Sequence, residues 1–244
     1  MKKLENLNIQ DMIFMDIETV RSEKELTPQS QMYEAWKYKT RYSTDAASKA
    51  GESLTSEEFY IQKAALYAPF SKIACITIGK ILDDQTAQLH SYFGYDEFEL
   101  LNRFNTHMNS FLLKNPNLYF VGFNIKQFDI PFINKRMIVN GIKPTILVDK
   151  GDAKPWELKD IDLSDLWKGS SMYADSLLAV VSALGLESPK VDMCGSETSD
   201  YYYNVENGIN NIAKYCEKDV ESNINVFNKF SFRNIINEFK SNLK

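Results

Sequence analysis

The segment MIFMDIETV, residues 12–20, is an apolar run that contains two carboxylates, Asp16 and Glu18. A short apolar run between charged segments is typical of a buried strand. Side chains alternate between the two faces of a strand, so both carboxylates point to the same side. Buried charge is costly unless it is neutralised, and these two acids can share an ion. The spacing alone also fits a solvated strand face in a chain with 33 acidic residues.

The residues that follow predict an α/β layer structure with a mixed sheet. Residues 21–70 are polar and carry patches that favour helices ending before Pro69. Residues 71–82 and 87–95 read as an antiparallel pair of strands. Further along, one strand and four helices are predicted from apolar periodicity, the strand at 117–124 and the helices at 96–115, 127–141, 176–186 and 207–230. We expect a loop over 188–200 and a single domain, residues 1–244, with 21–70 as an insertion.

Three further side chains belong with the strand acids. Asp129 lies just after the apolar strand and a Gly-Phe-Asn turn, at the start of a helix, where a lone Asp would be a capping residue. Tyr215 and Asp219 are four residues apart on a helix, and they share its apolar face. A carboxylate on that face is difficult to explain as a solvated group.

The donor set indicates the kind of ion. His90 and His107 are the only histidines, and both are far in sequence from the acids. Carboxylate oxygens without imidazole or thiolate select hard cations, so Mg²⁺ or Mn²⁺ is expected. Cys75, Cys194 and Cys216 lack a C-x-x-C spacing and read as reduced thiols of a cytosolic protein.

The whole-chain properties exclude several classes of protein. The formal net charge of −5 argues against a broad basic face that coats duplex phosphates. The amino terminus has no apolar signal region, and no apolar stretch approaches the ~18 residues that span a bilayer. We expect a soluble, cytoplasmic protein with no membrane partner.

Three motifs in order resemble those of a known family: D-I-E at 16–18, N-x-x-x-F-D at 124–129 and Y-x-x-x-D at 215–219. They are similar to the motifs of the DEDD 3′-5′ exonucleases of the DnaQ-like, RNase H-like superfamily, in the branch with a tyrosine in the third motif. The chain looks similar, over residues 11 to 230, to the exonuclease domain of family B DNA polymerases. Since no polymerase segment follows Lys244, a stand-alone protein is expected.

The resemblance implies a mixed five-stranded sheet with flanking helices and two divalent cations. It implies metal ligation by Asp16, Glu18, Asp129 and Asp219, with Tyr215 positioning the attacking water. It also suggests that three residues contact the terminal nucleotides, namely Thr19, Asn124 and Phe128.

We therefore expect a metal-dependent 3′-5′ exonuclease that removes nucleoside monophosphates from single-stranded DNA ends. An RNA-directed exonuclease and a catalytically idle binding module remain alternatives, and no polymerase or repair partner can be read from the chain. One insertion segment interleaves aromatic and basic residues: Trp36, Lys37, Tyr38, Lys39, Arg41 and Tyr42. This pattern fits either a stacking groove for a single strand or a solvated amphipathic helix.

Overall fold

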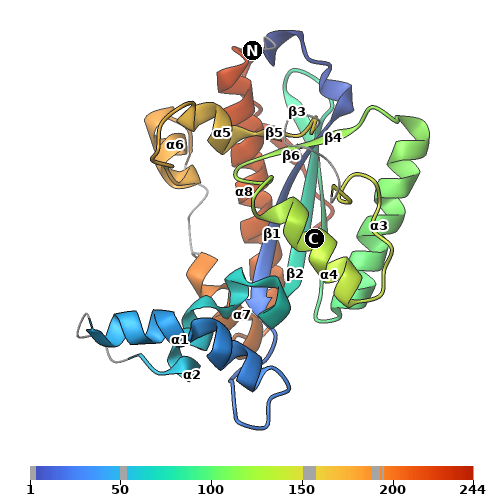
Figure 1. The fold of residues 1–244 in the computed structure, drawn as a ribbon. Coiled ribbons are helices and arrows are strands. Elements are labelled where there is room, and N and C mark those ends of the chain that lie inside the picture. Colours follow the sequence, from blue (N-terminus) through green and yellow to red (C-terminus); the bar gives the residue numbers. More distant parts are fainter. Residues whose placement is uncertain (1–3, 50–53, 151–157, 188–192, 194, 244) are drawn as a thin grey trace.

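The computed structural model describes residues 4–49, 54–150, 158–187, 193 and 195–243, except the side chains of 43–49 (Figure 1). The described residues contain one mixed sheet with the strand order β5-β4-β1-β2-β3-β6. Its strands are β1 (Met12–Arg21), β2 (Ser71–Ile81), β3 (Thr86–Phe93), β4 (Tyr119–Gly122), β5 (Ile161–Asp162) and β6 (Glu238–Lys240). The expected α/β class is confirmed.

Strand β1 lies inside the sheet, antiparallel to β2 and parallel to β4. The antiparallel strand β3 extends the sheet beyond β2, as predicted for the pair at 71–95. The sheet has six strands rather than the expected five, because the short β6 pairs in parallel with β3. Three residues are too few to give a strand period, so only the neighbouring edge of β3 reveals β6 as a strand.

Eight α-helices and five short 3₁₀ helices are found in the described residues. The α-helices are α1 (Tyr33–Lys49), α2 (Ser56–Lys63), α3 (Glu97–Lys114), α4 (Asp129–Val139), α5 (Leu163–Lys168), α6 (Leu177–Ala183), α7 (Thr198–Asn204) and α8 (Gly208–Phe230). The 3₁₀ helices are η1 (Leu4–Asn6), η2 (Ile9–Asp11), η3 (Ala64–Leu66), η4 (Ala68–Phe70) and η5 (Gly195–Glu197). No described helix has the length and apolar character needed to cross a membrane.

The alternation of side chains along β1 separates two cores. Ile13, Met15 and Ile17 pack with the apolar side chains of α3 and α4. Met12 and Phe14 face the other way and pack with residues of α6 and α8. Figure 1 shows α8 along one side of the sheet and α3 with α4 on the other. Period two therefore places Asp16 and Glu18 on the side of α8.

The insertion is helical, as expected, and it has its own small core. Helices α1 and α2 follow β1 and precede β2 in the sequence. Helix α2 begins with a capping box between Thr55 and Glu58. The predicted loop at 188–200 is wrong at its end, because η5 and the start of α7 fall within it. Residues 188–192 and 194 of that prediction lie outside the described residues.

Candidate active site

Three carboxylates converge beside the middle of β1. One oxygen from each of Asp16, Glu18 and Asp219 can be chosen so that all three lie within 4.8 Å of one another. Asp16 and Glu18 come from β1, and Asp219 comes from the third turn of α8, which packs across that strand. The register between β1 and β2 shifts directly after Glu18, a bulge of the kind that redirects strands next to active sites.

The fourth carboxylate is held against the same strand. Asp129 is the first residue of α4 and is only 3% exposed. Its Oδ1 accepts a hydrogen bond from the backbone N–H of Ile17, between the two strand acids, at 3.0 Å. Asp129 also interacts electrostatically with Asp16 and Asp219. The three motifs thus meet at one point, although Asp129 is 111 positions from Glu18 and 90 positions from Asp219 in the sequence.

The carboxylates raise one another's pKa values. Burial raises the pKa of Asp16 well above its ordinary value, and the charges of Asp129, Asp219 and Glu18 raise it further. Burial followed by the charge of Asp219 does the same to the pKa of Glu18. Burial raises the pKa of Asp129 to about 7, although the backbone N–H groups that bond its carboxylate oppose the shift. The unliganded cluster therefore disfavours full ionisation.

No lysine or arginine side chain of the described residues neutralises Asp16, Glu18 or Asp129, because none forms an ion pair with them. Their nearest donors are neutral: the N–H of Ile17 to Asp129 and the Thr198 hydroxyl to Glu18 at 3.2 Å. An oxygen-only donor set with unneutralised charge fits hard divalent cations. The residues present therefore suit the metal that the motifs imply.

Tyr215 stands one helical turn before Asp219 and forms a hydrogen bond with it. Burial is the largest cause that raises the pKa of Tyr215, and the charges of Asp219, Glu18 and Asp16 add to it. The phenol therefore stays protonated at neutral pH and cannot act as a base. Its hydroxyl can donate to Asp219 and still accept a hydrogen bond from a water molecule.

The loop before Asp129 is fixed by a residue that the sequence analysis did not single out. Asp162 is 3% exposed, and its carboxylate accepts hydrogen bonds from the N–H groups of Asn124 at 2.9 Å and Lys126 at 3.1 Å. The same carboxylate caps α5 through the N–H of Ser164 at 3.0 Å. Asn124 has a positive φ of 62°, a conformation that this bonding supports. The sequence signal that could have pointed to Asp162 is its type and place, because Asp is a favoured N-cap residue and Asp162 directly precedes α5.

Two other residues that contact the cluster, Thr198 and Cys216, were not predicted as site residues. Thr198, fully buried at the start of α7, bonds Glu18, and Cys216 donates to the backbone oxygen of Asp16 at 3.4 Å. Both contacts depend on tertiary packing, because Thr198 is 180 residues from Glu18 in sequence. The spacing of residues in the sequence therefore cannot predict such contacts.

The three predicted nucleotide contacts lie next to the acids in sequence but differ in exposure. Asn124 is exposed and Phe128 is half-buried, with its ring 5.1 Å from that of Phe132. Thr19 is buried, and its hydroxyl donates to the backbone oxygen of Ala65 at 2.8 Å. Asn124 is thus the most accessible of the three, and Thr19 is engaged within the protein.

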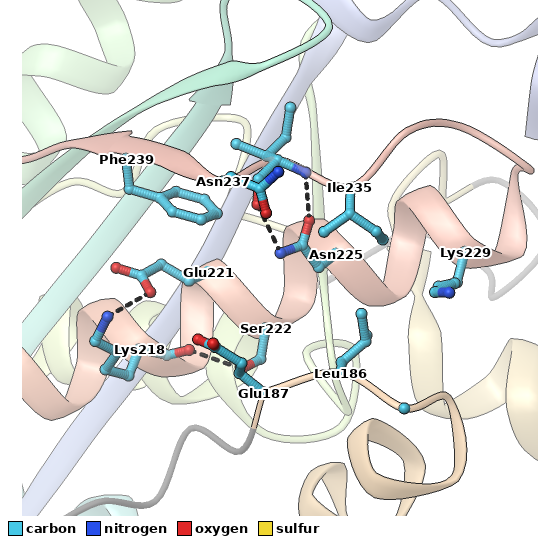
Figure 2. A pocket seen from close by; sticks show the side chains of 12 residues that line it. Leu186, Glu187, Lys218, Glu221, Ser222, Asn225, Lys229, Ile235, Asn237 and Phe239 are labelled. Carbon is cyan, nitrogen blue, oxygen red and sulfur yellow. Dashed lines mark hydrogen bonds and ion pairs between the residues drawn. The ribbon is translucent and has the colours of Figure 1, made fainter.

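A pocket of about 700 Å³ lies on another face of α8 and contains none of these site residues (Figure 2). In Figure 2, Asn225 bonds the backbone of Ile236 twice, through N–H···Oδ1 at 2.9 Å and Nδ2–H···O at 3.1 Å. Lys218 pairs with Glu221 at 2.7 Å on the same side of the helix. The pocket is thus a gap beneath the anchored C-terminal segment, separate from the carboxylate cluster.

Comparisons with known proteins show the family and the fold of this chain. A family model described as "Predicted 3'-5' exonuclease related to the exonuclease domain of PolB" matches residues 64–239, which include Asp129, Tyr215 and Asp219 but not β1. No curated protein matches the chain.

A solved structure supports the fold. The family B DNA polymerase from the hyperthermophilic archaeon Pyrobaculum calidifontis matches with a TM-score of 0.56 and 13% sequence identity. The match covers 89% of this chain and 24% of the polymerase, so this chain spans about a quarter of that protein. At this identity the likeness concerns the fold alone. The family match, which covers most of the chain, shows that the chain belongs to the family of predicted 3′-5′ exonucleases related to the exonuclease domain of PolB.

Proposed function

We propose that this protein hydrolyses the phosphodiester bond at the 3′ end of single-stranded DNA and releases nucleoside monophosphates. The observation that carries the proposal is the convergence of Asp16, Glu18 and Asp219 within 4.8 Å, with Asp129 bonded to the same strand. Membership of the exonuclease family supports it. A binding module has no need for four acids that raise one another's pKa values.

The metal site would hold two divalent cations, Mg²⁺ or Mn²⁺, ligated by Asp16, Glu18, Asp129 and Asp219. Such a pair supplies an activated water on one side of the phosphorus and stabilises the leaving 3′ oxygen on the other. The donor atoms that converge are carboxylate oxygens, which oxygen-preferring cations favour as ligands.

Tyr215 has the role of orienting the attacking water. Its raised pKa keeps the hydroxyl protonated, and the bond to Asp219 fixes the direction of the phenol. A fixed oxygen acceptor next to the carboxylates can align a water for attack, which is a contribution of positioning rather than proton transfer. Asn124 and Phe128 are proposed to contact the terminal nucleotide, and Thr19 to shape the site at the 3′ end.

The test is degradation of a 5′-labelled single-stranded DNA oligonucleotide with Mg²⁺ or Mn²⁺. Controls are EDTA, Asp16→Ala and the matched variant Asp84→Ala, which removes an exposed acid of the β2–β3 turn. We expect a ladder of shortened labelled products from the wild type and Asp84→Ala, and no products with EDTA or Asp16→Ala.

Two results would oppose the proposal. A ladder that persists in Asp16→Ala would disprove the site. No cleavage of DNA by the wild type would disprove the DNA exonuclease, and a matched RNA oligonucleotide in the same assay distinguishes an RNA-directed enzyme from an idle module.

A further inference from the structure

Helix α1 presents two exposed aromatic rings with an arginine between them. Tyr38 and Tyr42 are each 70% exposed and lie four residues apart, so they share one side of the helix. The guanidinium carbon of Arg41 is 3.8 Å from the centroid of the Tyr38 ring and 4.4 Å from that of Tyr42. The three side chains form a preassembled surface, called the α1 platform here, in which the cation limits the motion of both rings.

The helix beneath this platform is anchored to the insertion. Trp36 is fully buried, and its indole N–H donates to the backbone oxygen of Ser56 at 2.8 Å. Its ring makes edge contacts with Tyr60 at 5.3 Å and Phe70 at 5.0 Å. Of the interleaved aromatic and basic residues in the sequence, Trp36 is therefore a core residue. The anchoring leaves Tyr38 and Tyr42 at the surface of a fixed helix.

The insertion connects directly to the carboxylate site. Thr19, the residue after Glu18, bonds Ala65 at 2.8 Å in η3, and Tyr67 lies two residues further on. Tyr67 in turn contacts α1, because the amine of Lys39 lies 4.5 Å from the centroid of its ring. Figure 1 shows α1 and α2 together beside the end of the sheet at which β1 ends. Single-stranded DNA that leaves the carboxylate site in this direction would pass along the insertion.

The charge of α1 is opposite to that of the whole chain. Between Tyr33 and Tyr42 the helix carries Lys37, Lys39 and Arg41 but a single acid, Glu34, whereas the chain has a net charge of −5. The acidic site repels phosphate when no metal is bound, so affinity for a polyanion must come from cations elsewhere. Aromatic rings combined with basic groups are the chemistry that holds single strands, because every base has a face that can stack.

We propose that the α1 platform binds the single-stranded DNA whose 3′ end lies in the carboxylate site. Bases stack on Tyr38 and Tyr42, while Arg41, Lys37 and Lys39 attract the phosphates. This inference rests on the proposed exonuclease function. The platform lies outside residues 64–239, the part of the chain that matches the family model.

The test measures binding separately from cleavage. In an Asp219→Ala background, the affinity for a fluorescein-labelled dT20 strand is measured by anisotropy for the platform variants Tyr38→Ala/Tyr42→Ala and Arg41→Gln. The matched control is Tyr173→Ala, which removes a tyrosine that is 85% exposed outside the insertion. The double tyrosine variant should bind at least about twenty-fivefold more weakly, since each of the two lost base stacks costs a factor of about five or more. Arg41→Gln should lower the salt dependence of binding by about one phosphate contact.

Cleavage by the metal-loaded enzyme provides the second readout. The tyrosine variant should degrade dT20 more slowly at low substrate concentration and cleave the dinucleotide dT2 at the wild-type rate. Unchanged affinity for dT20, or an equal loss with Tyr173→Ala, would overturn the platform. An equal loss of dT2 cleavage would also overturn it, because the damage would then lie in the site. If the wild type cleaves nothing, the proposed function fails, whereas the anisotropy result still decides the platform.

Discussion

Two partly or fully buried acidic groups in this protein have opposite surroundings: the Glu97 carboxylate, and the four site acids Asp16, Glu18, Asp129 and Asp219. Glu97, 8% exposed at the start of α3, is bonded by Arg136 at 2.9 and 2.5 Å, by Asn140 at 2.9 Å and by the N–H of Ile73 at 2.7 Å. The site acids have like charges as neighbours, and the donors to Asp129 and Glu18 are neutral groups, the N–H of Ile17 and the hydroxyl of Thr198. Within the fold, the charge of Glu97 is compensated by Arg136, whereas the mutual repulsion of the site acids is not relieved.

This difference indicates which of the two serves the fold and which serves chemistry. A buried ion pair with all its bonds made is costly to break, because removing one partner leaves an unpaired charge. A cluster of like charges is already strained, so removing one acid relieves repulsion in the unliganded protein. Variants in the two groups should therefore separate stability from activity.

The largest effect is expected at Asp219. Asp219→Asn removes a charged ligand, and single-turnover cleavage with Mn²⁺ should fall at least about a thousandfold, since metal stabilisation of the transition state is worth several kcal/mol. In EDTA the melting temperature should stay equal or rise, because a like charge has gone. A cleavage rate within tenfold of the wild type, or a clear loss of stability in EDTA, would contradict this interpretation of the cluster.

The ion pair should show the reverse pattern. Arg136→Met leaves Glu97 buried and unpaired and should lower the free energy of unfolding by about 3–5 kcal/mol, measured by urea denaturation. The control is Lys218→Met, which breaks the exposed Lys218–Glu221 pair and should cost at most about 1 kcal/mol. Equal losses in the two variants would show that burial does not distinguish the pairs. Replacing Glu97 and Arg136 together by methionine should restore much of the loss.

The sequence predicts the site acids but not the ion pair between Glu97 and Arg136. Strand period two placed Asp16 and Glu18 on one face, and helical period placed Tyr215 one turn from Asp219; the structure brings these side chains together. The helix over 96–115 was also predicted closely, because its apolar stripe is long and α3 spans Glu97–Lys114. Such regular patterns depend on local geometry alone.

The features that the sequence did not predict depend on contacts between segments that are distant in the chain. Asp162 reaches the loop at Asn124, Thr198 reaches Glu18, and Arg136 reaches Glu97, each across at least 38 residues. Strand β6 forms because its backbone pairs with the edge of β3. Helix α7 is short and polar and has no apolar period that would predict it. The six-residue aromatic and basic pattern could not show that Trp36 is buried while Tyr38 and Tyr42 are exposed.

The pH dependence of stability should also report on the site acids, through Asp129. Asp129 ionises near its ordinary value of 3.8 in the unfolded chain and at about 7 in the folded, metal-free protein. Between these values the folded protein holds a proton that the unfolded chain has lost, so the free energy of unfolding falls as pH rises. We expect Asp129 to contribute about 2–3 kcal/mol to this fall from pH 4 to pH 7 in EDTA, less than an isolated group would give, because the acids share protons. Asp16 and Glu18, whose pKa values are also raised, add to the fall in the same direction.

The comparison is with Asp129→Asn, whose amide oxygen can still accept the N–H of Ile17 but cannot ionise. Chemical denaturation of both proteins across this pH range should give a shallower curve for the variant. Parallel curves would mean that Asp129 ionises normally. Saturating Mn²⁺ should reverse the trend of the wild type, because the ion binds the charged carboxylates of the folded state.

The smallest effect is expected at Tyr215, which belongs to the cluster but carries no charge. Tyr215→Phe should lower single-turnover cleavage about ten- to hundredfold, the cost of a misplaced attacking group, while Mn²⁺ affinity stays within about threefold. The matched control is Tyr203→Phe, which removes a hydroxyl that donates to the backbone oxygen of Arg21 at 2.8 Å. A phenol that only supported the fold would give similar modest losses of stability in both variants and leave both rates unchanged. A lower rate in Tyr215→Phe alone, with metal affinity retained, would place its hydroxyl on the water, because the four carboxylates that would hold the ions are all still present.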